Sequence, residues 1–180
     1  KAISGGANVF LRKGVTAKGE VNLGVAKIDG QLDCQDGKFL AEGIALDCNA
    51  ITVGASVFLS GKFEAQGEVN LVGAKIDRQL DCTGGKFLAE DMALNCNAIS
   101  VGANVFLRKR FTLEGHVNLV VTKIDGQLDC HDGKFLADGM ALNCNAITIA
   151  ASVVSPGTLT PHAHGTLAGA TTDQPLPWSA

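Results

Sequence analysis

The sequence predicts an all-β fold, a four-sided parallel β-helix of about six coils, on the strength of three observations. A 48-residue unit occurs three times, marked by the motif that ends at Cys34, Cys82 and Cys130. Each unit divides into halves of about 24 residues, in which apolar residues flank one polar residue about every five positions. The chain contains 22 glycines and only 5% aromatic residues, and no segment keeps the apolar period of a helix. A fixed period usually decides the fold, because each repeat buries its apolar face only against its neighbours.

The four predicted sides follow the order of the apolar pairs within one coil. Residues 69–71 form the first side, and residues 74–76, 80–82 and 85–87 form the second, third and fourth. Because strand side chains alternate, both apolar members of a pair point inward and the polar residue between them points outward. Parallel stacking of such coils at about 4.8 Å predicts a rod on the order of 30 Å long.

The fourth side has the clearest inward column, a predicted stack of phenylalanine rings. The rings recur at steps of 24 residues: Phe39, Phe63, Phe87, Phe111 and Phe135. The residues just before them predict an outward basic column: Lys38, Lys62, Lys86, Arg110 and Lys134. A mostly acidic column follows four positions later: Glu42, Gln66, Glu90, Glu114 and Asp138. We therefore expect a solvated, salt-bridged face with little net field.

The six cysteines occupy inward positions on two sides. Cys34, Cys82 and Cys130 belong to the third side, and Cys48, Cys96 and Cys144 to the first. Cysteines of one column lie two coils apart, on the order of 9.6 Å, which exceeds the roughly 7 Å Cα limit for a disulfide. No four thiols converge as structural zinc requires. We expect six buried, reduced thiols that bind no metal, a state that favours the cytoplasm.

The third side is the candidate partner surface. Its outward positions alternate aromatic and acidic residues: Phe10, Asp33, Phe58, Asp81, Phe106 and Asp129. A regular row of outward rings can mark a contact surface. The alternative interpretation is that the rings only shield the neighbouring strands.

The apolar pairs also support a family resemblance. "VNL", "AKI" and "GKF" at five-residue steps resemble a degenerate pentapeptide repeat, although steps of six residues, such as Ile28 to Cys34, depart from it. The unit "GEVNLVGAKIDRQLDC" followed by "VGANVFL" is similar to repeats in mostly uncharacterised bacterial proteins, some labelled oxidoreductases. The resemblance covers about residues 1–154 and implies a right-handed quadrilateral parallel β-helix. Residues 155–180, rich in Gly, Pro and Thr, are expected to form a tail or a cap.

These features favour a non-catalytic structural or protein-interaction scaffold. An active site needs unlike groups that converge, whereas each predicted column repeats one kind of group. We assign no catalytic residue, cofactor or metal, because no nucleotide-binding, hydrolase or metalloprotease motif occurs. The cluster "DCHD" around His131 could suggest catalysis, but its counterparts "DCQD" and "DCTG" indicate drift of the repeat.

Two alternatives remain for the function. A carbohydrate-active β-helix enzyme would use the aspartates of the third side with Lys27, Lys75 and Lys123. DNA mimicry, as in gyrase-binding pentapeptide proteins, would need a strongly acidic surface, whereas the net charge is only −3.

The expected partner is another protein or a second copy of the chain. We expect no nucleic-acid or membrane partner, because the charge is nearly balanced and no apolar run reaches roughly 18 residues. The sequence enters the repeat part-way round a coil, which predicts a fragment or processed form of a longer protein. The rim of the first coil would expose Ile3, Val9 and Val15, and this predicts a homodimer through the N-terminal end.

Overall fold

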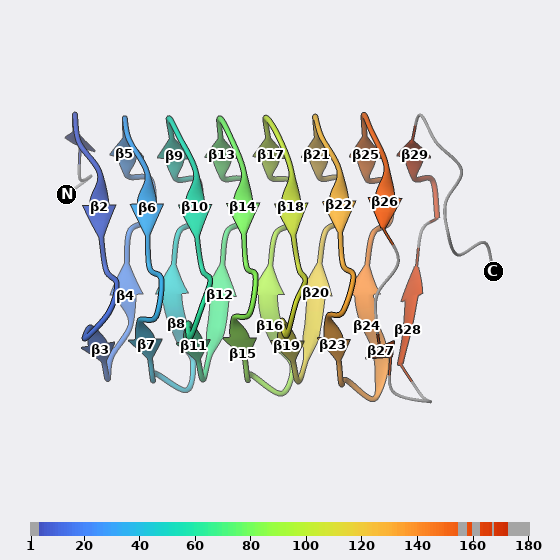
Figure 1. Ribbon diagram of the computed structural model, residues 1–180, viewed down its shortest axis with the longest axis horizontal. Coiled ribbons are helices and arrows are strands. Elements are labelled where there is room, and N and C mark those ends of the chain that lie inside the picture. Colours follow the sequence, from blue (N-terminus) through green and yellow to red (C-terminus); the bar gives the residue numbers. More distant parts are fainter. Residues whose placement is uncertain (1–3, 155–157, 160–162, 167, 173–180) are drawn as a thin grey trace.

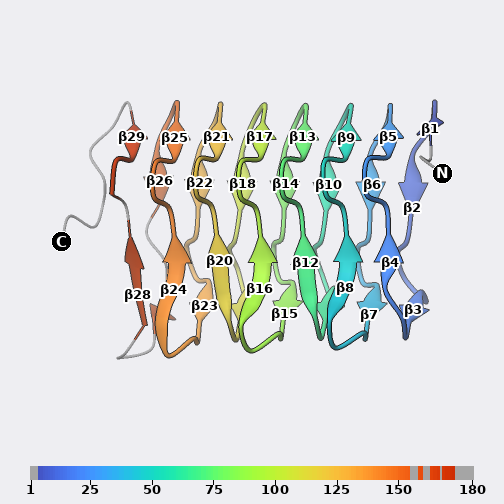
Figure 2. The same ribbon diagram turned by 180° about the vertical axis from the view of Figure 1, so that it is seen from behind.

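The computed structural model describes residues 4–154, 158–159, 163–166 and 168–172. All regular elements in these ranges are β-strands in parallel pairs, and this part of the chain has no helix that could cross a bilayer. The strands form one sheet of eight and three of seven, here sheets A to D. Successive coils follow the long axis of the molecule (Figure 1), as the view from behind also shows (Figure 2). The four-sided parallel β-helix is confirmed, with about seven turns in place of about six.

Sheet D forms the predicted first side. Its strands are β4 (Val21–Asn22), β8 (Ile44–Asp47), β12 (Glu68–Asn70), β16 (Met92–Asn95), β20 (His116–Asn118), β24 (Gly139–Asn143) and β28 (Ala163–Thr166). Its outward amides bond neighbouring coils, since Asn22 and Asn70 each donate from Nδ2 to Asp47 at 3.1 Å. Such side-chain rows reinforce the backbone ladder between coils.

Sheet A forms the second side. Its strands are β1 (Ser4–Gly5), β5 (Lys27–Ile28), β9 (Thr52–Val53), β13 (Lys75–Ile76), β17 (Ser100–Val101), β21 (Lys123–Ile124), β25 (Thr148–Ile149) and β29 (Thr171–Thr172). Lysines point outward in every second coil, opposite Thr or Ser of the coils between. Two of them pair locally, Lys27 with Asp29 at 3.8 Å and Lys123 with Asp125 at 3.1 Å.

Sheet B forms the third side and carries the candidate surface. Its strands are β2 (Val9–Phe10), β6 (Leu32–Asp33), β10 (Val57–Phe58), β14 (Leu80–Asp81), β18 (Val105–Phe106), β22 (Leu128–Asp129) and β26 (Val153–Val154). The register pairs each outward phenylalanine with an aspartate of the next coil, as predicted. The inward partners are Val or Leu, so this side contributes aliphatic groups to the core.

Sheet C forms the fourth side, and its register corrects one prediction. Its strands are β3 (Thr16–Ala17), β7 (Lys38–Phe39), β11 (Glu64–Ala65), β15 (Lys86–Phe87), β19 (Thr112–Leu113), β23 (Lys134–Phe135) and β27 (Thr158–Leu159). Lys38 and Lys86 both pair with Glu64, and Lys134 pairs with Thr112. The predicted continuous basic column is therefore wrong. Lys62 and Arg110 precede the strands, because the corner before sheet C is longer in alternate coils.

The phenylalanine stack is continuous despite this change of register. Neighbouring ring centroids from Phe39 to Phe135 lie 5.2–5.4 Å apart, in tilted pairs. In alternate coils the triplet "GKF" is replaced by "FEA" or "FTL", so that Phe63 occupies the backbone position of the glycine. A side chain on Gly85 would collide with the Leu59 carbonyl and crowd the Phe87 ring. Glycine therefore leaves room for the ring of its own coil, and Phe63 takes the equivalent backbone position in the neighbouring coil.

The corner between sheets D and A repeats one backbone conformation. Val25, Ala50, Ala98, Val121 and Ala146 have φ between 52° and 56° there, and the equivalent Gly73 has φ of 66°. This left-handed conformation is costly for a β-branched residue and cheap for glycine. The two valines therefore carry local strain, and both are exposed.

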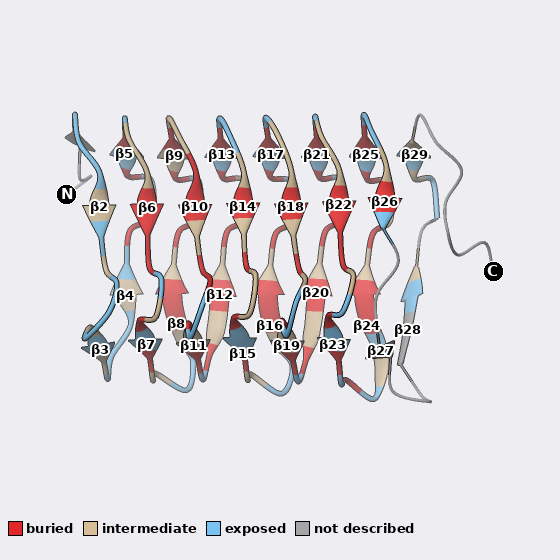
Figure 3. Ribbon diagram, in the orientation of Figure 1, coloured by how far each residue is buried: buried red, intermediate tan, exposed pale blue. Residues whose placement is uncertain are grey.

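The buried core runs from Leu23 to Val153, whereas the described residues of the first and last strands are intermediate or exposed (Figure 3). All five stacked phenylalanines are fully buried. All six cysteines are free and buried, as predicted. Burial raises the pKa of every one of these thiols, to about 12 for Cys144 and well above the ordinary value for Cys48, Cys82 and Cys130.

The coils continue beyond residue 154. The segment expected to be a tail or a cap contributes β27, β28 and β29, which pair with β23, β24 and β25. These strands lengthen sheets C, D and A by one coil and account for the seventh turn.

Candidate interaction surface on sheet B

The outward face of sheet B is built from three modules that recur every second coil. We define a module by its outward phenylalanine, the residue two positions later, and the aspartate that pairs with the phenylalanine from the next coil. The first module is Phe10, Arg12 and Asp33, the middle module is Phe58, Ser60 and Asp81, and the last module is Phe106, Arg108 and Asp129. The first and last modules contain arginine, and the middle one does not.

In the last module, one guanidinium contacts both the ring and the carboxylate. The Arg108 Cζ lies 3.8 Å from the Phe106 ring centroid, and Arg108 Nη1 donates to Asp129 Oδ2 at 2.6 Å. Planar guanidinium groups stack on aromatic faces while their N–H groups bond carboxylates, and an ammonium group lacks this geometry. The arginine covers the acid, so that Asp129 is only 3% exposed.

The first module has the same arrangement with looser contacts. Arg12 Cζ lies 4.4 Å from the Phe10 ring centroid, and Arg12 Nη1 donates to Asp33 Oδ2 at 3.2 Å. Asp33 is 4% exposed, whereas the Phe10 ring is 47% exposed. Two arginines 96 positions apart thus make the same two contacts.

His131 adds a further partner to the last module. Its ring Nδ1 lies 2.7 Å from Asp129 Oδ1, and its backbone N–H donates to the same oxygen at 3.1 Å. Burial alone would raise the pKa of Asp129, but the hydrogen bonds from His131 and Arg108 outweigh burial and lower it. His131, at the position where the repeat varies, therefore stabilises the ionised form of Asp129. Arg108 Nε remains buried without a hydrogen-bond partner.

In the middle module no arginine of the same module covers the aspartate. Ser60 stands where the other modules carry arginine, and it is short and buried. Asp81 is partly exposed, in contrast to the two buried aspartates. Its Oδ1 accepts the Thr83 N–H at 2.9 Å, and no residue in the described part of the chain donates to its Oδ2. The Thr83 hydroxyl is buried with no hydrogen-bond partner.

The sequence predicted the row of rings and acids but missed the arginines. Phe58 and Phe106 are half-buried, so that the row is less open than predicted. The signal was present in "FLR" at 10–12 and 106–108 and in "FLS" at 58–60. A strand pattern shows that the residue two positions after the ring points outward, but it does not show that the side chain folds back over the ring.

The lysines of the carbohydrate-active alternative do not join this surface. Lys27, Lys75 and Lys123 lie in strands of sheet A, and the aspartates lie in strands of sheet B. Lys27 and Lys123 pair with aspartates of their own sheet, and Asp33 and Asp129 pair with arginines. The predicted lysine and aspartate groups therefore belong to two separate faces.

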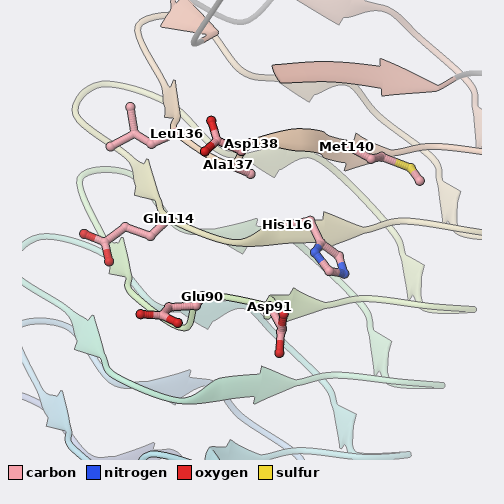
Figure 4. Close-up of a pocket in the computed structure, with 8 residues that line it drawn as sticks. All are labelled: Glu90, Asp91, Glu114, His116, Leu136, Ala137, Asp138 and Met140. Atoms are coloured by element: carbon pink, nitrogen blue, oxygen red, sulfur yellow. The ribbon is translucent and has the colours of Figure 1, made fainter. Parts of the chain in front are cut away.

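The corner between sheets C and D carries the predicted acidic column, but in a different setting. An open depression of about 510 Å³ is lined there by Glu90, Asp91, Glu114, His116 and Asp138, with side chains spread along the edge (Figure 4). A neighbouring depression includes Glu42 and Glu68. None of these acids forms an ion pair with a residue that the structure describes, so the expected salt-bridged face is not found. No metal-binding group of His, Cys, Asp or Glu occurs among the described residues.

The expected dimer residues lie in the first coil. Val9 is half-buried in β2, and Val15 is half-buried in the corner before β3. Ile3 lies outside the described residues. The association through these residues stays a prediction from the sequence.

Comparison of the chain with protein-family models, with curated proteins and with solved structures gives no match. The resemblance to pentapeptide repeats therefore rests on the residues alone.

Proposed function

We propose that this chain is a non-catalytic scaffold that presents sheet B to a protein partner. The observation that carries the proposal is the set of three modules, which places an outward ring and a carboxylate at every second coil of one flat side. Aromatic and arginine side chains dominate the binding energy of protein interfaces, and this face offers both.

The rigidity of the surface supports the same role. Phe58 and Phe106 project from strands that are hydrogen-bonded to both neighbouring coils, as in the bond from Cys82 N to Phe106 O at 2.9 Å, and Phe10 projects from the edge strand β2, which pairs with β6. In the first and last modules the guanidinium fixes ring and acid together. A pre-ordered surface loses little conformational entropy on association.

In this proposal the cluster of unlike groups in the last module has a structural role. Arg108, Asp129 and His131 are unlike groups that do converge, but their hydrogen bonds are directed at one another. The aspartate holds the arginine and the histidine against the strand. The hydrogen bonds of this cluster therefore hold the last module together.

Site-specific photo-crosslinking in cells that produce the chain tests the proposal. A benzoylphenylalanine in place of Phe10 or Phe58 should give a crosslinked protein product of one defined mass. The same group in place of Val25 or Val121, which lie on the corner between sheets D and A and are 65% and 60% exposed, should give none. Equal products from both faces, or none from sheet B, would contradict the proposal.

A further inference from the structure

We infer that the middle module of sheet B is a binding site for an arginine side chain of a partner protein. The inference rests on the proposed function, because it names the chemistry by which sheet B would recognise its partner. The same chain contains two occupied copies of the site, in which Arg12 and Arg108 fill the position themselves. The middle copy keeps the ring and the acid and lacks the guanidinium.

The three copies are equivalent in their register and in one backbone hydrogen bond. Phe58 pairs with Asp81 in the same register as Phe10 with Asp33 and Phe106 with Asp129. In each copy, Oδ1 of the aspartate accepts the N–H of the residue two positions later, at 2.9–3.1 Å. The carboxylates are therefore held in the same orientation, with Oδ2 left for the guanidinium.

Two polar atoms near the middle module have no hydrogen-bond partner among the described residues. Asp81 Oδ2 has no donor among the described residues, while the same atom of Asp33 and of Asp129 accepts an arginine N–H. Asp81 is partly exposed, in contrast to the buried Asp33 and Asp129, so that a group from outside can reach it. The buried, unpartnered Thr83 hydroxyl lies two positions further along the same strand end.

The pairing of an aromatic residue with a carboxylate suits one kind of cation. Phe58 points outward, and Asp81 of the next coil is its register partner. A guanidinium can stack on the one and donate to the other at the same time, as both internal arginines do. A lysine ammonium is a compact, strongly hydrated charge that cannot do both equally well. The site is therefore expected to select arginine.

The experiment is a titration followed by NMR, with N-acetyl-arginine N-methylamide as the probe. We expect saturable shifts of the Phe58 and Asp81 signals, with a dissociation constant on the order of millimolar for an isolated side chain. N-acetyl-lysine N-methylamide at equal ionic strength should bind at least about fivefold more weakly. Shifts that do not saturate, or that are equal for both probes, would overturn the inference.

Two variants locate the binding within the chain. Ser60→Arg should fill the site from within, abolish the probe shifts and raise the unfolding temperature by about 2–4 °C. Asp81→Asn, which needs no extra space, should also abolish them. Arg108→Ser should create a second open copy and add shifts at Phe106. Shifts that persist unchanged in Ser60→Arg or in Asp81→Asn would refute the site.

The failure of this inference and of the proposed function can be told apart. If position 58 crosslinks a partner equally well in wild-type and in Asp81→Asn backgrounds, sheet B remains the partner surface and the arginine site is refuted. If the arginine probe binds while no position on sheet B gives a crosslink, the site stands as a guanidinium site and the scaffold proposal fails.

Discussion

The guanidinium of Arg108 lies 3.8 Å above the Phe106 ring and 2.6 Å from the carboxylate of Asp129 in the next coil. One side chain therefore ties two neighbouring coils together on the outside of sheet B. Its side chain is 25% exposed, whereas that of Arg12 is 54% exposed in the equivalent contact. The two copies of one arrangement differ in how far water screens them, and this difference can be measured.

Replacement of Arg108 by serine should lower the free energy of unfolding by about 2 kcal/mol, because Asp129 stays buried without its cation. Arg12→Ser is the matched control, and it should cost less, about 1 kcal/mol, because the Arg12 side chain is 54% exposed and its contact with the buried Asp33 is longer, at 3.2 Å. Urea unfolding of both variants measures the difference. Equal costs would show that the closer contact of Arg108 has no energetic meaning.

Asp129 should make the stability depend on pH in the acid range. Hydrogen bonds from His131 and Arg108 hold its pKa below the ordinary value of 3.8. The ionised acid therefore stabilises the fold fully above about pH 4, and this contribution is lost as the pH falls through the lowered pKa. Asp129→Asn should flatten this acid limb of the curve of stability against pH. An unchanged limb in the variant would assign the acid sensitivity to other carboxylates.

The two kinds of phenylalanine should respond differently to truncation. Phe87 is fully buried between two other rings, and Phe87→Ala should cost roughly 3–5 kcal/mol through lost burial and a cavity. Phe106 points outward beneath Arg108, and Phe106→Ala should cost about 1 kcal/mol. Thermal unfolding followed by circular dichroism compares them. Equal costs would mean that the assignment of inside and outside is reversed.

Val121 should be a site where a smaller residue stabilises the protein. Its φ of 56° is unfavourable for a β-branched residue, and its side chain is 60% exposed. Val121→Gly should raise the free energy of unfolding by about 0.5–1 kcal/mol, since relief of strain exceeds the entropy cost of glycine. The control is Val154→Gly in β26, an exposed valine without positive φ, which should destabilise. A loss of stability at both sites would contradict the strain.

The six thiols should be unreactive in the native protein. Burial raises the pKa of each, and the thiolate is the reactive form. A chromogenic disulfide reagent at pH 8 should titrate none of them until denaturant is added, and then all six. Fast reaction of even one thiol in the native state would place that cysteine outside the core.

Most of the fold could be predicted, because the repeat period determines which residues stack. The inward columns of sheets A, B and D follow from alternation around Ile76, Leu80 and Val69, and the structure pairs them as expected. Sheet C could not be predicted in full. The 24-residue step aligns Phe63 with Phe39, whereas the backbone register pairs Ala65 with Phe39. The ring of Phe63 nevertheless packs on the ring of Phe39.

The candidate surface was predicted only in outline. The alternation of Phe58 and Asp81 could be read from the sequence, because it depends on strand periodicity. The path of a long arginine side chain depends on rotamers and on the neighbouring coil, and no local pattern encodes it. Arg108 lies over the Phe106 ring, and Ser60 stands at the equivalent position of the middle module. The middle module therefore lacks the third copy of the arginine.

A double-mutant cycle between Ser60→Arg and Asp81→Asn tests most directly the claim that the middle module lacks only its guanidinium. The free energies of unfolding of the wild type, both single variants and the double variant are measured under one set of conditions. The account predicts that Ser60→Arg stabilises the protein only while Asp81 is present, with a coupling of about 1 kcal/mol. Additivity within about 0.3 kcal/mol would show that an arginine at position 60 does not reach Asp81, and would contradict the equivalence of the three modules.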